Sequence, residues 1–271
     1  MKSTRWPSFL VAASVVGTTF ACGASANQQE SASSVAMAAA QDTIGPAAPA
    51  GAPASAFPGP KRPVADIVAP RWSDEDDRDD AGEFARVVQL AKIGRGQRIA
   101  DIGAGDGYYV ARLSPLVGPT GQLFGQDIIP DYLTLLQRRV RRERLGNVLV
   151  VRGDPHDPRL PTAGVDVAIM IHMYHEIEQP FALLWNLATA MRPGGRLVIL
   201  DLERPTFGHG TPPALLRCEL TAVGYRQLSF TTTAPSEYVA IFLAPDSASR
   251  PSPATISSAL RSSPCRAPGD R

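Results

Sequence analysis

The residues with the clearest chemical potential form a glycine-rich turn, Asp101-Ile102-Gly103-Ala104-Gly105-Asp106-Gly107. The turn follows a short apolar run and precedes a stretch with helical spacing. Glycines at such a place let the backbone bend sharply and let a ligand lie close against it. The glycine spacing is G-x-G-x-G and not the G-x-G-x-x-G of the dinucleotide fingerprint. We therefore expect a ligand-binding turn of another type, with a purely structural turn as the alternative.

Two carboxylates stand at the ends of the next two apolar runs. Asp127 ends the run 122–127, and Asp154 follows the run 148–151. An ionised carboxylate accepts paired hydrogen bonds well, so both residues are candidates for binding a polar ligand. Each also has a structural alternative. Asp127 could cap the helix that follows, and Asp154 could stabilise a turn rich in proline.

The elements that must position these residues alternate regularly. Amphipathic stretches such as Phe84, Val87, Val88 and Ala91 have helical spacing. Apolar runs typical of strands lie at 98–102, 122–127, 148–151, 165–171, 196–202, 227–231 and 238–243. Repeated strand-then-helix order predicts an α/β fold with a doubly wound, mostly parallel seven-stranded sheet. The last two runs predict a closing antiparallel hairpin.

These features together resemble the class I methyltransferases that use S-adenosylmethionine. The acid two residues before Gly103 makes the turn similar to motif I of that family, D-x-G-x-G-x-G, and Met191-Arg192-Pro193-Gly194-Gly195 is similar to the family's turn into strand five. Tyr174-His175-Glu176, after the fourth strand, resembles a broad group of small bacterial members. The similarity runs from Phe84 to about Leu243 and implies a Rossmann-like fold.

The resemblance also implies S-adenosylmethionine as the cofactor and names the residues that hold it. Asp127 would accept hydrogen bonds from both ribose hydroxyls, and Asp154 would meet the adenine amino group. The full set of predicted cofactor residues is Asp101, Gly103, Ala104, Gly105, Gly107, Asp127 and Asp154.

Methyl transfer from a sulfonium is an in-line displacement with an activated electrophile, so the protein must mainly orient the partners and exclude water. Ligands of parallel sheets collect beyond the strand ends, which favours His172, Tyr174, His175 and Glu176. We predict His175 as base or substrate-orienting group, Tyr174 lining the methyl channel and Glu176 orienting a neighbour. Alternatively, His175 and Glu176 cap the helix beginning near Gln179. No metal is expected, because H-x-x-H-E differs from the zinc-enzyme order H-E-x-x-H.

The amino terminus has the order of a secretory leader: Lys2 and Arg5, an apolar run at 9–20 and then small residues. The run is shorter than the roughly 20 residues of a membrane-spanning helix. Ala24-Ser25-Ala26 has the A-x-A form of a cleavage site, whereas Thr19-Phe20-Ala21-Cys22 resembles a lipobox that would attach lipid to Cys22. We expect a location in the cell envelope or periplasm, either free or tethered through Cys22, with an apolar cytoplasmic leader as the alternative.

Composition divides the chain of 271 residues into four segments. We predict a leader at 1–26, a disordered Ala/Pro/Ser linker at 27–63, a methyltransferase domain at 64–245 and a disordered tail at 246–271, because the flanking segments hold few large apolar residues. The acidic run 73–80 fits the start of the first helix.

The net charge and the number of cysteines restrict the partners and the structural class that we expect. A net charge of +1 predicts no nucleic-acid partner. Three cysteines, Cys22, Cys218 and Cys265, are too few and too scattered to predict a disulfide framework. The leading hypothesis is methyl transfer to a small-molecule or envelope substrate. The alternatives are a non-catalytic adenosyl-ligand-binding module of the envelope and, against the glycine spacing, a nicotinamide oxidoreductase; the oligomeric state is left open.

Overall fold

The computed structural model describes residues 44–68 and 74–267. The predicted leader, Cys22 and both predicted cleavage sites lie outside the described residues. Among the described residues, no helix combines the length and the apolar character needed to cross a membrane.

A seven-stranded sheet organises the described residues, with the strand order β3-β2-β1-β4-β5-β7-β6. The strands are β1 (Arg98–Ile102), β2 (Gln122–Asp127), β3 (Val148–Arg152), β4 (Val165–Ile171), β5 (Met191–Leu202), β6 (Arg226–Ala234) and β7 (Glu237–Leu243). The first five are parallel, and β7 pairs antiparallel with both β5 and β6. The predicted fold class is therefore confirmed. The strand order reverses between β1 and β4, which is where open α/β sheets bind ligands.

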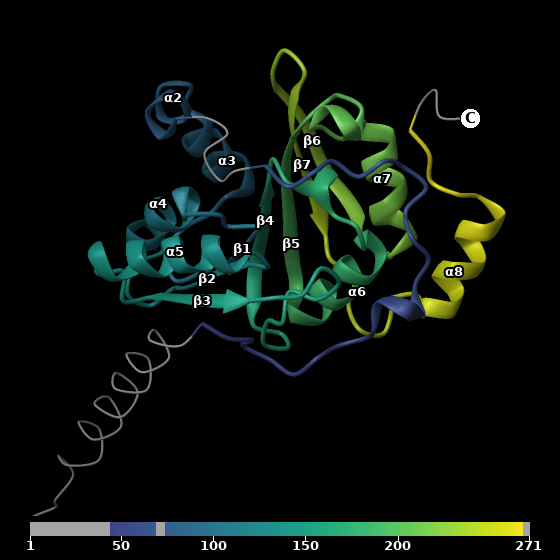
Figure 1. Ribbon diagram of the computed structural model, residues 1–271, viewed down its shortest axis with the longest axis horizontal. Helices are drawn as coiled ribbons and strands as arrows, with labels where there is room; N and C mark the ends of the chain where they lie inside the picture. The colour runs from purple at the N-terminus through teal and green to yellow at the C-terminus, as the bar shows by residue number, and fades with distance from the viewer. Residues whose placement is uncertain (1–43, 69–73, 268–271) are drawn as a thin grey trace, which may run out of the picture. The chain divides into compact units, whose positions relative to one another are not determined.

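Helices cover both faces of the sheet (Figure 1). One face packs against α3 (Glu83–Ala91), α4 (Tyr108–Val117) and α5 (Pro130–Arg142). The other packs against α6 (Pro180–Ala190), α7 (Pro213–Ala222) and α8 (Pro253–Ser262). Neighbouring residues of one strand enter different cores, as Ile99 and Ala100 do in β1, because side chains alternate across a strand. Burial on both faces explains the continuous apolar runs in the sequence.

The remaining elements are short. They are η1 (Ala54–Ala56), α2 (Glu75–Asp80), η2 (Tyr174–Glu176) and η3 (Thr206–Gly208). The acidic run forms α2, a separate helix whose first turn is capped by Asp74. The sequence analysis had assigned this run to the start of the following helix, α3.

Residues 44–68, which we call the N-terminal strap, follow an ordered path along α6 and α7 (Figure 1). The strap corrects the expectation of disorder up to residue 63. The Gly51 N–H donates to Asp157 Oδ2 at 2.7 Å, the Ala52 N–H donates to Asn186 Oδ1 at 2.9 Å, and the Phe57 ring is buried. The composition of a segment indicates how much apolar surface it can bury when it folds alone. The strap instead docks its backbone on a domain that already has a core.

Arg62 of the strap forms a buried ion pair with Glu219 of α7, with Nε 3.0 Å from Oε1 and neither side chain exposed. The guanidinium also donates to the carbonyl oxygens of Tyr174, His175 and Ile177 at 3.3–3.4 Å. The Tyr174 hydroxyl donates to Glu219 Oε2 at 2.9 Å. One cation therefore joins the strap, the η2 turn and α7.

We expect Arg62→Met to lower the free energy of unfolding by about 3–5 kcal/mol, because it leaves the Glu219 carboxylate buried without a countercharge. Arg192→Ala is the matched control, since Arg192 pairs with Asp166 at the surface, and its expected loss is at most about 1 kcal/mol. Urea unfolding measures both. Equal losses in the two variants would contradict the central role of Arg62.

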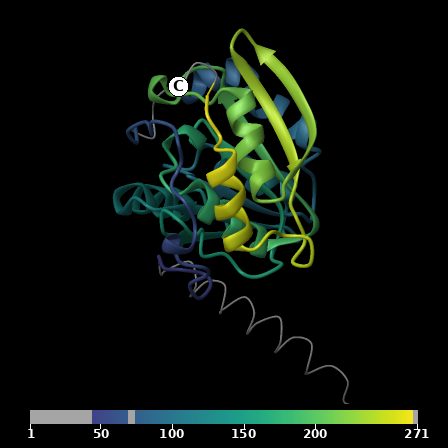
Figure 2. The same ribbon diagram turned by 90° about the vertical axis from the view of Figure 1, so that its right-hand side faces the viewer.

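The C-terminal segment is also ordered, which corrects the predicted disorder for residues 246–267. The yellow helix α8 lies beside α7 in Figure 2, and Ile256 is fully buried. The Arg250 guanidinium stacks 3.6 Å from the centroid of the Trp185 ring. A disulfide joins Cys218 of α7 to Cys265, with a Cα–Cα distance of 5.6 Å. The sequence analysis missed this bond, because two cysteines separated by 47 residues give no spacing signal.

Replacing both bonded cysteines, Cys218→Ser with Cys265→Ser, should lower the free energy of unfolding by about 2–4 kcal/mol, because the unfolded chain regains the freedom of a long loop. A reducing agent should destabilise the parent protein to a similar extent and leave the double variant unchanged. Denaturant unfolding with and without the reductant tests this, and an unaffected parent protein would refute it.

Candidate functional site

The glycine-rich turn leaves β1 and is anchored to the end of β2. The backbone N–H groups of Gly103 and Ala104 both donate to the Gln126 carbonyl at 2.9 Å. Gly103 and Gly105 have φ values of +74° and +57°, a region that glycine enters without steric cost. This geometry turns the chain back across the sheet end and exposes its backbone to a cavity.

The cavity opens beyond the ends of β1, β2 and β4, where the strand order reverses. Of the ten residues predicted for the site, seven line it: Asp101, Gly103, Ala104, Gly105, Asp127, Asp154 and Glu176. The other lining residues used below are Ile67, Val68, Arg78, Tyr108, Ile128, Ile129 and His172. The structure thus brings together residues from four separate parts of the sequence.

Asp127 ends β2 and faces the glycine-rich turn. Its Oδ2 accepts from the Gly105 N–H at 2.9 Å, while Oδ1 accepts from the N–H groups of Ile128 and Ile129 at 2.7 and 2.9 Å. Burial raises the pKa of this carboxyl, and the three backbone donors oppose the shift. A carboxylate has about four acceptor positions, so Asp127 can hold the turn and still accept from a ligand.

Asp101 is a buried acid at the end of β1. Burial raises its pKa to about 7, with Arg78 lowering it and Asp127 raising it. Arg78 belongs to α2, where its guanidinium pairs with Glu83 at 2.6 Å and lies 3.8 Å from the centroid of the Tyr108 ring. Sequence reasoning missed Arg78, because a single cation in an acidic run looks like part of a solvated helix.

His172 follows β4 with φ +53°, an uncommon backbone conformation for a residue other than glycine. Its Nε2 lies 3.3 Å from Glu83 Oε2. Burial alone would raise the pKa of Glu83, but His172 and Arg78 lower it to about 2. The contact between His172 and the ionised Glu83 carboxylate therefore fixes the position of His172 in the cavity wall.

Gly107, which the sequence analysis predicted as a cofactor residue, does not line the cavity. It is the N-cap residue of α4, with φ +94°, and a Cβ there would lie 2.5 Å from Leu136 Cδ1. Glycine is required for the bend and for the close approach of α5.

Tyr174 and His175 also lie outside the cavity, contrary to the prediction that both face the substrate. Tyr174 is fully buried, and its hydroxyl bonds to Glu219 instead of lining a methyl channel. The buried His175 ring points its Nδ1 at Asp201, 3.1 Å from Oδ1. Both residues sit on a tight 3-10 turn, so adjacent side chains point in different directions and only Glu176 faces the cavity.

Glu176 is held by the strap, because its Oε1 accepts from the Val68 N–H at 3.2 Å. Burial raises its pKa to about 7, and the Val68 N–H and His175 oppose that shift. The alternative that His175 and Glu176 cap the next helix is wrong. Gln179 is the N-cap residue of α6, and no side chain caps it.

The raised pKa of Asp101 should make the free energy of unfolding depend on pH. Between about pH 4, the unfolded pKa, and about pH 7, the folded protein retains a proton that the unfolded chain has released, so the free energy of unfolding falls as pH rises through this window. Asp101→Asn should therefore lose less stability between about pH 5 and about pH 8 than the parent protein does. Urea unfolding at both pH values measures the difference.

Asp131→Asn is the control for this measurement, since Asp131 is exposed in the first turn of α5. It should follow the parent protein at both pH values. The same pH dependence in Asp101→Asn as in the parent would show that Asp101 does not carry the proton.

Comparison with known proteins finds methyltransferases that are similar to the part of this chain that contains the glycine-rich turn. Residues 99–195 match the family model described as "Methyltransferase domain". The ubiquinone/menaquinone biosynthesis C-methyltransferase UbiE of Pseudomonas putida is 31% identical over 126 residues, which are 44% of this chain and 47% of that protein. The protein-L-isoaspartate O-methyltransferase of Methanothrix thermoacetophila is 30% identical over 118 residues, 42% of this chain and 52% of that protein. The chain thus spans about half of the length of these curated relatives.

Solved structures share the fold. A SAM-dependent methyltransferase from Aquifex aeolicus superposes with a TM-score of 0.57 at 20% identity, covering 64% of this chain and all of that one (100%). A chain described as a possible exported protein from Bordetella parapertussis superposes with a TM-score of 0.51 at 20% identity, covering 62% of this chain and 68% of that one. The protein therefore shares the fold of these solved structures, and residues 99–195 are similar to the methyltransferase domain family.

Proposed function

We propose that this protein binds S-adenosylmethionine in the cavity and transfers its methyl group to a small-molecule or envelope acceptor. The observation that carries the proposal is the meeting of the glycine-rich turn and Asp127 on one cavity, with Gly105 N–H and Asp127 Oδ2 2.9 Å apart. The methyltransferase match of residues 99–195 supports the same conclusion.

The residues present fit this cofactor. The glycine backbone leaves room at the turn, and Asp127 keeps an acceptor position for a sugar hydroxyl. Ile128 and Ile129 offer an apolar wall for a base, and Asp154 lies at the cavity for its amino group. Arg78 supplies a cation for the amino-acid carboxylate. When bound, the cofactor supplies an electrophilic methyl group on a sulfonium.

The chain's own residues would orient the reactants and exclude water. Ile67 and Val68 of the strap line the cavity, so the strap shields it from solvent. Glu176 is the one member of the predicted catalytic trio that lines the cavity. Its pKa of about 7, raised by burial, suits it to accept a proton from an acceptor near neutral pH. The nearly balanced charge supports a small molecule over nucleic acid.

We also propose that the protein works in the cell envelope. The order of residues at the amino terminus supports export, and the disulfide between Cys218 and Cys265 supports an oxidising compartment. Cys22 is the proposed tether, and the mass of the mature amino terminus distinguishes a lipidated protein, a cleaved one and an uncleaved cytoplasmic one. Export would separate the protein from a donor made in the cytosol, which favours a non-catalytic adenosyl-ligand-binding module as the second candidate function.

Asp127→Asn should weaken binding of S-adenosylmethionine by roughly 10–150-fold, because it removes the charge from a hydrogen bond worth about 1.5–3 kcal/mol. Isothermal titration calorimetry measures the change. Asp131→Asn, in the neighbouring helix and outside the cavity, should bind like the parent protein.

Transfer of a labelled methyl group to components of an envelope extract then separates the two functions. Binding with transfer supports the enzyme, and binding without transfer supports the binding module. A parent protein that does not bind the cofactor, or an Asp127→Asn protein that binds it equally well, would refute the proposal.

A further inference from the structure

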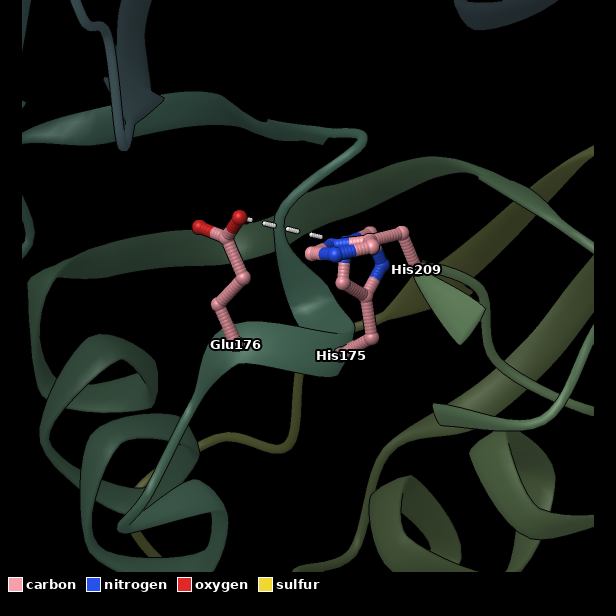
Figure 3. Close-up of side chains that lie close together, drawn as sticks. All are labelled: His175, Glu176 and His209. Carbon is pink, nitrogen blue, oxygen red and sulfur yellow. Dashed lines mark ion pairs between the residues drawn. The ribbon is translucent and has the colours of Figure 1, made fainter. Parts of the chain in front are cut away.

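Three side chains that can bind metal lie close together (Figure 3), and one of them, Glu176, lines the cavity. His175, Glu176 and His209 each offer one ligand atom, and these atoms all lie within 4.8 Å of one another. His175 Nε2 and Glu176 Oε1 are 4.0 Å apart, which is too long for a hydrogen bond. Two imidazoles and a carboxylate are a ligand set that zinc accepts.

A buried carboxylate already orients the first of these ligands. Asp201 is fully buried at the end of β5, and its carboxylate oxygens lie 3.1 and 3.2 Å from His175 Nδ1. The Leu202 N–H and the Thr211 hydroxyl hold Asp201 in place at 2.8 and 2.7 Å. With the proton of His175 on Nδ1, the lone pair of Nε2 faces Glu176. Such a carboxylate–histidine pair is the usual support of a metal ligand.

The second imidazole is held in an uncommon backbone conformation. His209 follows η3 with φ +55°, and its Nδ1 is buried without a hydrogen bond among the described residues. The loop is anchored, because the Thr206 hydroxyl donates to the Pro63 carbonyl of the strap at 2.7 Å. An unpaired buried nitrogen costs free energy, which a bound cation would recover. The His209 and His175 rings lie edge to face, with centroids 5.5 Å apart.

We propose that His175, Glu176 and His209 form a three-ligand site for a divalent transition-metal ion of the zinc type. An ion about 2.0–2.1 Å from each ligand would hold the ligand atoms about 3.3 Å apart, so the set must contract by roughly 1 Å. Among the described residues, the Val68 N–H is the one hydrogen-bond donor to Glu176, and His175 Nε2 is already 4.0 Å from Glu176 Oε1, so we expect small side-chain rotations to suffice.

The place of Glu176 on the cavity wall gives the ion a role that replaces the one proposed above for the free carboxylate, because a carboxylate bound to a metal ion no longer accepts a proton. Three protein ligands leave a fourth position open, as in catalytic zinc sites. That position would face the cavity and bind an oxygen of the methyl acceptor. This role rests on the proposed function, whereas metal binding does not depend on it.

Sequence spacing missed this site. The histidine near His175 in the sequence is His172, whose Nε2 faces Glu83, while the proposed third ligand lies 34 positions after His175 in the chain.

Untagged protein, dialysed against a chelator, tests the proposal. Titration with Co²⁺ should give one equivalent with the visible absorption of a tetrahedral site, and Zn²⁺ should displace it. His209→Asn should weaken Zn²⁺ binding by more than about 100-fold, since loss of a supporting partner alone costs about 10–100-fold. Asparagine tolerates the backbone conformation of His209, so the variant should fold.

His172→Asn is the matched control, because His172 has a similar backbone conformation and belongs to a second cluster with Glu83 and Glu237. It should bind Zn²⁺ like the parent protein. Glu176→Gln serves as the second variant and should lose binding as His209→Asn does.

Binding weaker than about 1 mM in the parent, or a loss that follows His172→Asn and not His209→Asn, would overturn the proposal. Calorimetric titration of the same sample with S-adenosylmethionine tests the proposed function separately from the metal site. Cofactor binding without metal binding refutes the metal site alone, and metal binding without cofactor binding refutes the proposed function alone.

Discussion

The position of the candidate site depends on the buried guanidinium of Arg62. Its ion pair with Glu219 anchors the strap to α7, and its remaining donors bind the carbonyl groups of the η2 turn. That turn carries His175 and Glu176. The strap continues from Arg62 to Val68, whose N–H binds Glu176. One buried cation, bonded to Glu219 and to three carbonyl groups, therefore holds both the η2 turn at the cavity wall and the strap segment that covers the cavity.

The charges around the cavity suit the ligand that we propose. Three acids line it, the buried Asp101 and Asp127 and the half-buried Glu176, and desolvation raises the pKa of each. Such a cavity favours a cationic ligand, because a positive charge stabilises carboxylates that water cannot reach. Arg78 adds a positive charge to the cavity lining and forms an ion pair with Glu83. A sulfonium with a carboxylate tail matches this separation of charge.

The two ends of the described chain support the same region. The disulfide joins the C-terminal segment to Cys218, which is adjacent in sequence to Glu219, the partner of Arg62. The strap and α8 both pack on the face formed by α6 and α7. The segments outside the sheet are thus part of the domain and help to hold its functional end.

The sequence by itself determined the mostly parallel seven-stranded sheet with its closing hairpin and the glycine-rich turn with Asp127, because apolar periodicity and glycine placement act over a few residues. It also identified the polar stretch after β4. It did not determine which of Tyr174, His175 and Glu176 faces the cavity, since a 3-10 turn decides that direction. Arg78, His209, the strap and the disulfide were decided only by the tertiary structure. Their partners lie far away in the chain, and no local pattern records a contact that forms only when distant segments pack together.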